Sequence, residues 1–98
     1  MPSRHFERGR KHMKRDGPEY APDKGINEFN AGAADGCSAC MWALGVAFER
    51  GLGALKDPVL AEHWYKMSAE LGSSEAQYSL GSLLHGLGRM TKLLNGFG

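Results

Sequence analysis

The chain of 98 residues repeats itself at an interval of 36 residues. When the sequence is shifted by that interval, segment 21–36 falls on 57–72, and prolines, aromatic residues and glycines coincide. The same shift places segment 37–48 on 73–84. A repeat of this length is typical of stacked supersecondary units, each of which buries its apolar face against its neighbours. The repeat is therefore the strongest constraint on the fold.

The first half of the best-preserved unit predicts an amphipathic helix. Cys40, Leu44 and Phe48 recur at the three-to-four-residue spacing that places apolar side chains on one helical face. Gly51 follows, and glycine is favoured in the left-handed position that ends a helix. The spacing predicts a helix over 38–50.

The second half of the unit predicts another helix, which closes at Gly72. Asp57 is a good N-cap residue because its carboxylate can accept from free backbone N–H groups. Pro58 suits the first helical position, where its missing N–H costs nothing. Two helices joined by a short loop predict an antiparallel pair.

The next copy predicts a helix that begins at a capping box formed by Ser74 and Gln77 and reaches about His85. Gly45 and Gly81 lie in the middle of their predicted helices, where glycine costs about 1 kcal/mol relative to alanine. A cost repeated at the same place indicates close approach of a neighbouring helix.

The tetrapeptide FERG occurs at 6–9 and again at 48–51. These copies are 42 residues apart, so the sequence predicts six additional residues in the first loop, near Pro18. We expect an all-α fold, a short solenoid of antiparallel helix pairs with about five helices. Residues 1–20 are predicted to form a basic helix or arm and a loop. Residues 21–98 are predicted to form the solenoid, with a partial, a full and a truncated unit.

Two motifs in the full unit resemble a known family. Segment 40–53 reads C-x-x-x-L-G-x-x-F-x-x-G-x-G, and segment 56–72 reads K-D-x-x-x-A-x-x-W-Y-x-x-S-A-x-x-G. Together they resemble the Sel-one-like repeat, a relative of the tetratricopeptide repeat, although Cys40 stands where that family usually has alanine. The resemblance implies a non-catalytic protein-interaction module, an adaptor or assembly scaffold in a multiprotein complex.

The helix faces opposite the predicted core are candidates for partner binding. In a helical solenoid such faces line a groove that receives a segment of a partner. At about 100° per residue these positions are Trp42, Val46, Glu49, Tyr78, Ser82 and His85. An alternative stays open in which Trp42 and Tyr78 pack between repeats.

Half of the twelve basic residues lie in the first fifteen positions, although the net charge is only +1. They are Arg4, Arg8, Arg10, Lys11, Lys14 and Arg15. Three interpretations are open for this basic arm: a solvated helix face, a surface for an acidic protein, or a phosphate-binding arm in a ribonucleoprotein such as a ribosome or a mitochondrial assembly.

Cys37 and Cys40 form a C-x-x-C motif, which can serve thiol redox chemistry or supply half of a zinc site. The repeat favours packing instead, because these positions correspond to Ser73 and Ala76 of the next copy. No second pair of cysteines is present. We therefore predict no enzyme activity, no metal and no cofactor, and keep a small thiol redox protein as the less favoured alternative.

The C-terminal segment is largely apolar, which suggests that a protein partner or a second copy covers it, or that the chain is a piece of a longer protein. No apolar run approaches the roughly 20 residues that span a bilayer, and the basic start is not followed by the apolar stretch of a signal peptide. We expect a cytoplasmic or other intracellular protein. The arginine-rich start leaves a mitochondrial location open.

Overall fold

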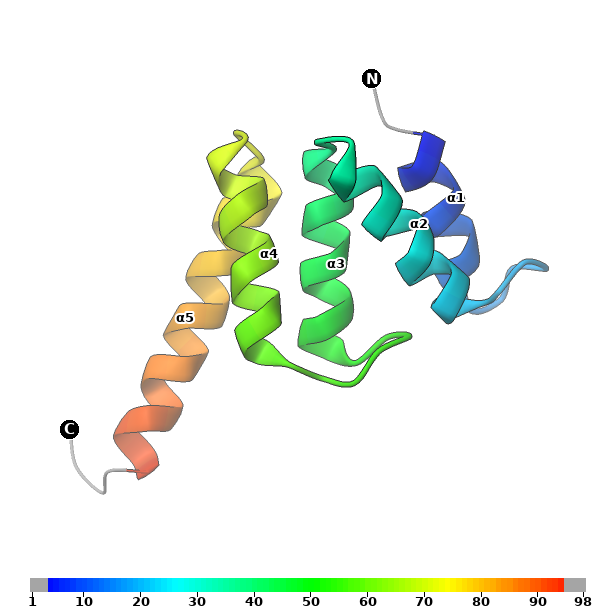
Figure 1. Cartoon of the computed structure of the whole chain (residues 1–98). Helices are drawn as coiled ribbons and strands as arrows, with labels where there is room; N and C mark the ends of the chain where they lie inside the picture. Colours follow the sequence, from blue (N-terminus) through cyan, green and yellow to red (C-terminus); the bar gives the residue numbers. More distant parts are fainter. Residues whose placement is uncertain (1–3, 95–98) are drawn as a thin grey trace.

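The computed structural model describes the backbone of residues 4–94 and the side chains of residues 4–85. This part of the chain contains helices and no strands, which confirms the all-α prediction (Figure 1). The helices are α1 (Arg4–Met13), α2 (Pro22–Ala34), α3 (Ser38–Arg50), α4 (Pro58–Glu70) and α5 (Ser74–Leu94).

The helices stack in chain order. α1 packs against α2, α3 packs against α4, and α3 lies between α2 and α4 (Figure 1). α5 packs on α4, whereas α1 and α3 make little contact with each other. Each helix is thus supported mainly by the helices before and after it, which is the organisation of an α-solenoid. The described helices confirm the predicted short solenoid.

The predicted helix boundaries of the full unit are confirmed. α3 ends at Gly51, whose φ of 72° lies in the left-handed region that favours glycine. The Asp57 carboxylate accepts from the backbone N–H groups of Val59 (3.1 Å) and Leu60 (3.2 Å), so it caps α4 as predicted.

The predictions for the last helix are wrong at both ends. Ser73, not Ser74, caps α5, because its hydroxyl accepts from the N–H of Ala76 (3.2 Å) and Ser74 is already helical. The helix also continues past the predicted end near His85, to Leu94. The helix can continue past His85 because glycine costs only about 1 kcal/mol inside a helix and no proline follows within residues 86–94.

Two glycines define how the helix pairs correspond. Gly9 in α1 lies beneath the ring of Phe29, which a Cβ on that glycine would overlap. Gly45 in α3 lies beneath the ring of Tyr65 in the same way. Phe29 and Tyr65 are 36 residues apart, and so are the two glycines. α1 is therefore the first helix of a pair that follows the same interval as the rest of the chain.

This correspondence overturns the prediction of six extra residues near Pro18. The first FERG, Phe6–Gly9, lies in the middle of α1, whereas the second, Phe48–Gly51, lies at the end of α3. The two copies therefore occupy different places in their units. The contacts of Phe29 with Gly9 and of Tyr65 with Gly45 define which residues of the two helix pairs correspond. The two FERG segments do not correspond under this alignment.

The interior is formed mainly by α2, α3 and α4. Leu44, Cys40 and Tyr65 have at most 1% of their surface exposed, and the predicted apolar face of α3 points into this core. The Tyr65 hydroxyl donates to the Glu49 carboxylate (2.6 Å). Burial, and then this hydrogen bond, raise the pKa of Tyr65 above its ordinary value of 10.0.

An interaction between His5 and Glu28 joins α1 to α2. The Nδ1 atom of His5 lies 2.8 Å from the Glu28 carboxylate. This hydrogen bond is the main cause that lowers the pKa of Glu28 below its ordinary value of 4.5. The carboxylate form is therefore favoured in the folded protein, and the stabilisation is lost as the pH falls through the lowered pKa.

The first prediction concerns the pH dependence of this interaction. Glu28→Gln should lower the free energy of unfolding at pH 7, because it removes the charged partner of His5. It should also flatten the fall in stability between about pH 5 and pH 3, because the titrating group is gone. Urea unfolding across this range measures both effects. Parallel pH profiles for the two proteins would contradict the prediction.

Candidate interaction groove

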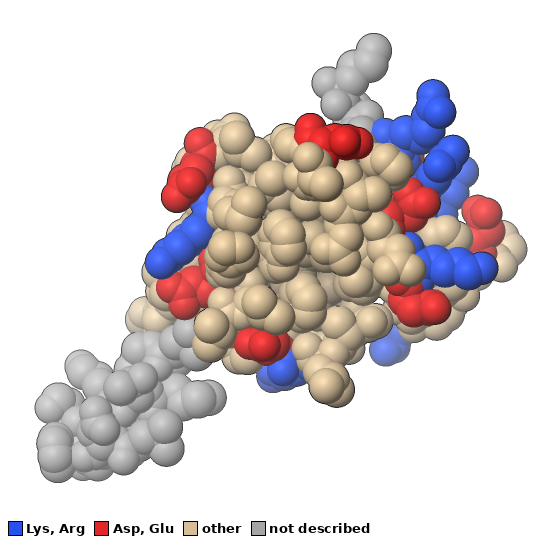
Figure 2. Space-filling view, in the orientation of Figure 1, with Lys and Arg blue, Asp and Glu red and all other residues tan. Residues whose placement is uncertain are grey.

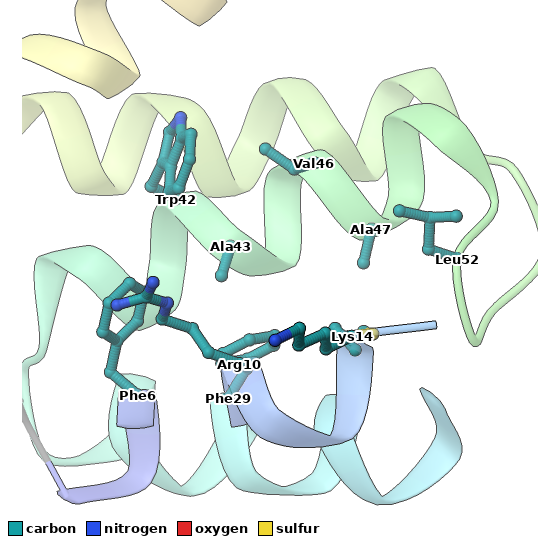
Figure 3. Close-up of a pocket in the computed structure, with 10 residues that line it drawn as sticks. Phe6, Arg10, Lys14, Phe29, Trp42, Ala43, Val46, Ala47 and Leu52 are labelled. Atoms are coloured by element: carbon teal, nitrogen blue, oxygen red, sulfur yellow. The ribbon is translucent and has the colours of Figure 1, made fainter. Parts of the chain in front are cut away.

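An apolar groove lies between α1 and α3. It has a volume of about 250 Å³. Phe6 points from α1 toward α3, and the Arg10 and Lys14 side chains run along the α1 side (Figure 3). The lining residues are Phe6, Arg10, Met13, Lys14, Phe29, Trp42, Ala43, Val46, Ala47 and Leu52. A concave apolar surface of this size can hold one or two side chains of a bound segment.

The base of the groove is formed by Phe29, a residue of the core. Phe29 rises from α2 beneath the groove and meets Phe6 of α1, with ring centroids 6.2 Å apart and a tilt of 40°. Ala43 and Ala47 supply the α3 wall, and their short side chains leave the space between the helices unfilled. Most of the lining residues stand on α1, α2 and α3, whereas Lys14 and Leu52 follow the ends of α1 and α3.

The contact between α1 and α3 differs from the equivalent contact between α3 and α5, one repeat later. Between α3 and α5, the Trp42 Nε1–H donates to the Ser79 hydroxyl (3.0 Å) and joins the two helices. The positions 36 residues earlier are Phe6 and Ala43. Phenylalanine has no N–H and alanine has no hydroxyl, so this hydrogen bond has no equivalent between α1 and α3.

Two cations lie along the α1 side of the groove. The Arg10 guanidinium carbon lies 5.6 Å from the centroid of the Phe6 ring, in the geometry of a cation–π contact. Lys14 lies one turn further along, and both side chains are exposed (Figure 3). The groove therefore combines an apolar floor with positive charge beside it, which suits an apolar side chain next to a carboxylate.

The six predicted partner-binding residues lie in three environments. Trp42 and Val46 line the groove. Glu49 instead accepts the hydrogen bond from buried Tyr65. The remaining three, Tyr78, Ser82 and His85, are exposed on α5 and do not line the groove.

The alternative, in which Trp42 and Tyr78 pack between repeats, describes Trp42 but not Tyr78. Trp42 is half-buried and bonded to α5, so it packs between repeats while also facing the groove. Tyr78 is 81% exposed. Phe6 and Phe29 of the groove were not among the predicted binding residues. Extending the 36-residue interval back to residue 4 would have aligned Phe6 with Trp42.

The six residues of the basic arm are all exposed and belong to α1 or the turn after it. Arg10 and Lys14 line the groove, whereas the other four do not. Figure 2 shows Lys and Arg gathered at the α1 end of the molecule, with Asp and Glu among them. The nucleic-acid interpretation of the arm stays a prediction.

The two cysteines have structural roles. They form no disulfide, and Cys40 is fully buried. Gly32 of α2 lacks the Cβ that would collide with the Cys40 sulfur, so this glycine provides the room for cysteine in place of alanine. The Cys37 sulfur accepts from the Cys40 N–H (3.3 Å) and caps α3, as Ser73 caps α5.

The second prediction tests these roles. Cys37→Ser should change the free energy of unfolding by less than about 1 kcal/mol, because a hydroxyl can make the same cap. Cys40→Ala should cost about 1 kcal/mol for the small cavity beside Gly32. Thermal unfolding followed by circular dichroism measures both. A folded double variant that had lost a biological activity would instead support the thiol redox hypothesis.

Neither a metal site nor a membrane span is found in the described part of the chain. No group of three or more histidine, cysteine, aspartate or glutamate side chains is arranged there to hold a metal ion. None of the helices, as far as they are described, combines the length and hydropathy needed to cross a bilayer.

Comparison with known proteins gives one family. A family model, the Sel1 repeat, matches residues 38–73 and again 74–95, which together are more than half of the chain. The first match begins with α3 and ends after α4, and the second begins with α5. No curated protein and no solved structure matches the chain.

Proposed function

The chain belongs to the Sel1 repeat family, and on that premise we propose that it is an adaptor that binds a partner segment in the groove between α1 and α3. Sel1 repeats are generally protein-interaction modules and are typically non-catalytic. The proposed occupant is a short segment with an apolar side chain next to an aspartate or glutamate.

The groove itself is the observation that carries this proposal. Its apolar lining, with Phe29 at the base and Ala43 in the α3 wall, would desolvate a leucine or phenylalanine side chain. Arg10 and Lys14 stand beside it and would pair with a neighbouring carboxylate. Such a rim charge would contribute to selectivity and to the rate of association more than to affinity.

The third prediction concerns binding in the groove. The chain has two tryptophans, so Trp64→Phe leaves Trp42 as a single fluorescent reporter on the groove. We expect peptides with a central leucine or phenylalanine flanked by aspartate to change the Trp42 emission on titration. Val46→Glu should weaken this binding by about tenfold or more, because it places a negative charge in an apolar wall.

Two controls make the test specific. Arg10→Glu should weaken binding of the acidic peptides, whereas Arg8→Glu, which reverses an exposed charge outside the groove, should have a much smaller effect. A second peptide series carries lysine in place of aspartate. Equal binding of both series, or equal effects of the two arginine substitutions, would contradict the proposed site.

A further inference from the structure

We propose that the exposed face of α5 is the interface of a homodimer, in which Tyr78 of each copy packs over Gly81 of the other copy. This surface is separate from the groove, and its test needs no partner peptide. The molecule already makes a contact of this kind twice within one copy.

In both internal helix pairs an aromatic ring covers a glycine of the preceding helix. Phe29 of α2 lies on Gly9 of α1, and Tyr65 of α4 lies on Gly45 of α3. A Cβ on either glycine would overlap the ring, so the absence of a side chain is what lets the helices approach. The contact combines burial of a large ring with close packing of two antiparallel helices.

Gly81 of α5 is the third member of this series, 36 residues after Gly45. Among the described residues, no heavy atom lies within 4 Å of the position that its Cβ would take. Gly81 is exposed and costs helix stability of about 1 kcal/mol, yet no described ring covers it. Gly81 is therefore equivalent to Gly9 and Gly45 in the repeat, but no described aromatic ring packs on it.

The helices that supply the rings share a pattern around the aromatic residue. Small residues stand four positions before it and three and four positions after it, so that the ring is the only large group on that stripe. The members are Gly25, Phe29, Gly32 and Ala33 in α2, and Ala61, Tyr65, Ser68 and Ala69 in α4. α5 carries the same pattern in Ser74, Tyr78, Gly81 and Ser82.

α5 therefore presents both halves of the contact on one exposed face. Tyr78 is 81% exposed, and residues three apart are neighbours on a helix surface, so the ring and the glycine lie side by side. In a two-fold dimer, contact of Tyr78 with Gly81 of the other copy also creates the reverse contact. The two α5 helices would run antiparallel, as the helices within each pair do.

The charge and polarity of this face agree with pairing of two copies. Residues 76–85 contain no Asp, Glu, Lys or Arg, so two copies would bring no like charges together. Leu84, on the same side and one turn beyond Gly81, is 42% exposed and would lose apolar surface to water on pairing.

Sedimentation equilibrium of the full chain tests the proposal. We expect a monomer–dimer equilibrium at micromolar concentrations, and Tyr78→Ala should weaken it by about tenfold or more. Gly81→Ala should do the same, because a Cβ would displace the ring. Alanine favours the helix more than glycine does, so circular dichroism should show at least as much helix in Gly81→Ala as in the unsubstituted chain. Weaker dimerisation of this variant would then reflect loss of the interface and not loss of folding. Leu55→Ala, at a loop residue that is 90% exposed, should leave the equilibrium unchanged.

A second measurement locates the interface directly. A photoreactive benzoyl-phenylalanine in place of Tyr78 should give a covalent dimer, with the crosslink close to position 81 of the other copy. The same group in place of Lys66 on α4 should give none. A chain that is monomeric at every concentration, or a dimer that neither Tyr78→Ala nor Gly81→Ala weakens, would overturn the proposal.

Discussion

Tyr65→Ala is expected to lower the free energy of unfolding by about 3–5 kcal/mol, the range for removing a large buried aromatic side chain. The Tyr65 ring is 1% exposed, and it is the group that packs α4 on Gly45 of α3. Removing it leaves a cavity between these two helices. The hydrogen bond to Glu49 is lost as well. Urea unfolding followed by circular dichroism measures the change.

Two control variants separate the ring from the hydroxyl and from surface effects. Tyr65→Phe keeps the ring on Gly45 and removes only the hydrogen bond, so about 1 kcal/mol is expected. Tyr78→Ala removes the same atoms from an exposed tyrosine. In dilute solution, where the chain is expected to be monomeric, it should leave the free energy of unfolding nearly unchanged. A Tyr65→Ala effect no larger than that of Tyr78→Ala would show that α4 does not pack on α3 in this way.

The same substitution should have opposite effects at two glycines that the repeat makes equivalent. Gly45→Ala should lower the free energy of unfolding by about 1–3 kcal/mol, because the new methyl group overlaps the Tyr65 ring. Gly81→Ala should raise it by about 1 kcal/mol in dilute solution, because alanine favours the helix and meets no described atom within 4 Å. Thermal and urea unfolding of both variants, measured side by side, check the signs.

Gly9→Ala provides the matched third case. Its methyl group would overlap Phe29, so it should destabilise the protein as Gly45→Ala does. Stabilisation at all three glycines would mean that no ring covers any of them. Destabilisation in dilute solution at Gly81 as well would mean that α5 is covered within the monomer, and this outcome would also count against the dimer.

Most of the fold could be predicted from local signals. The apolar spacing around Leu44 marked the core face of α3, and the cap at Asp57 marked the start of α4. Each signal involves residues within a few positions of one another, so it can be recognised without knowing the tertiary structure. The end of α5 could not be predicted in this way, because glycine after His85 is only a weak stop signal.

The candidate groove was predicted only in part. Trp42 and Val46 could be identified from the helical periodicity of α3. Arg10 and Lys14 were recognised only as members of a basic segment, and nothing local placed them beside these α3 residues. Their proximity depends on how α1 packs on α2, which in turn positions α1 across from α3.

The sequence by itself determined the all-α class, the helix pairs of the full unit and the repeat family, because periodicity, caps and repeated motifs are properties of neighbouring residues. Only the tertiary structure decided the register of α1, since Gly9 and Phe29 meet across twenty residues of chain and the FERG match pointed elsewhere. It also decided which surface is open. The repeat interval aligns Phe6 and Ala43 with Trp42 and Ser79, but only the packed helices show that Trp42 and Ser79 meet and that Phe6 and Ala43 line a groove instead.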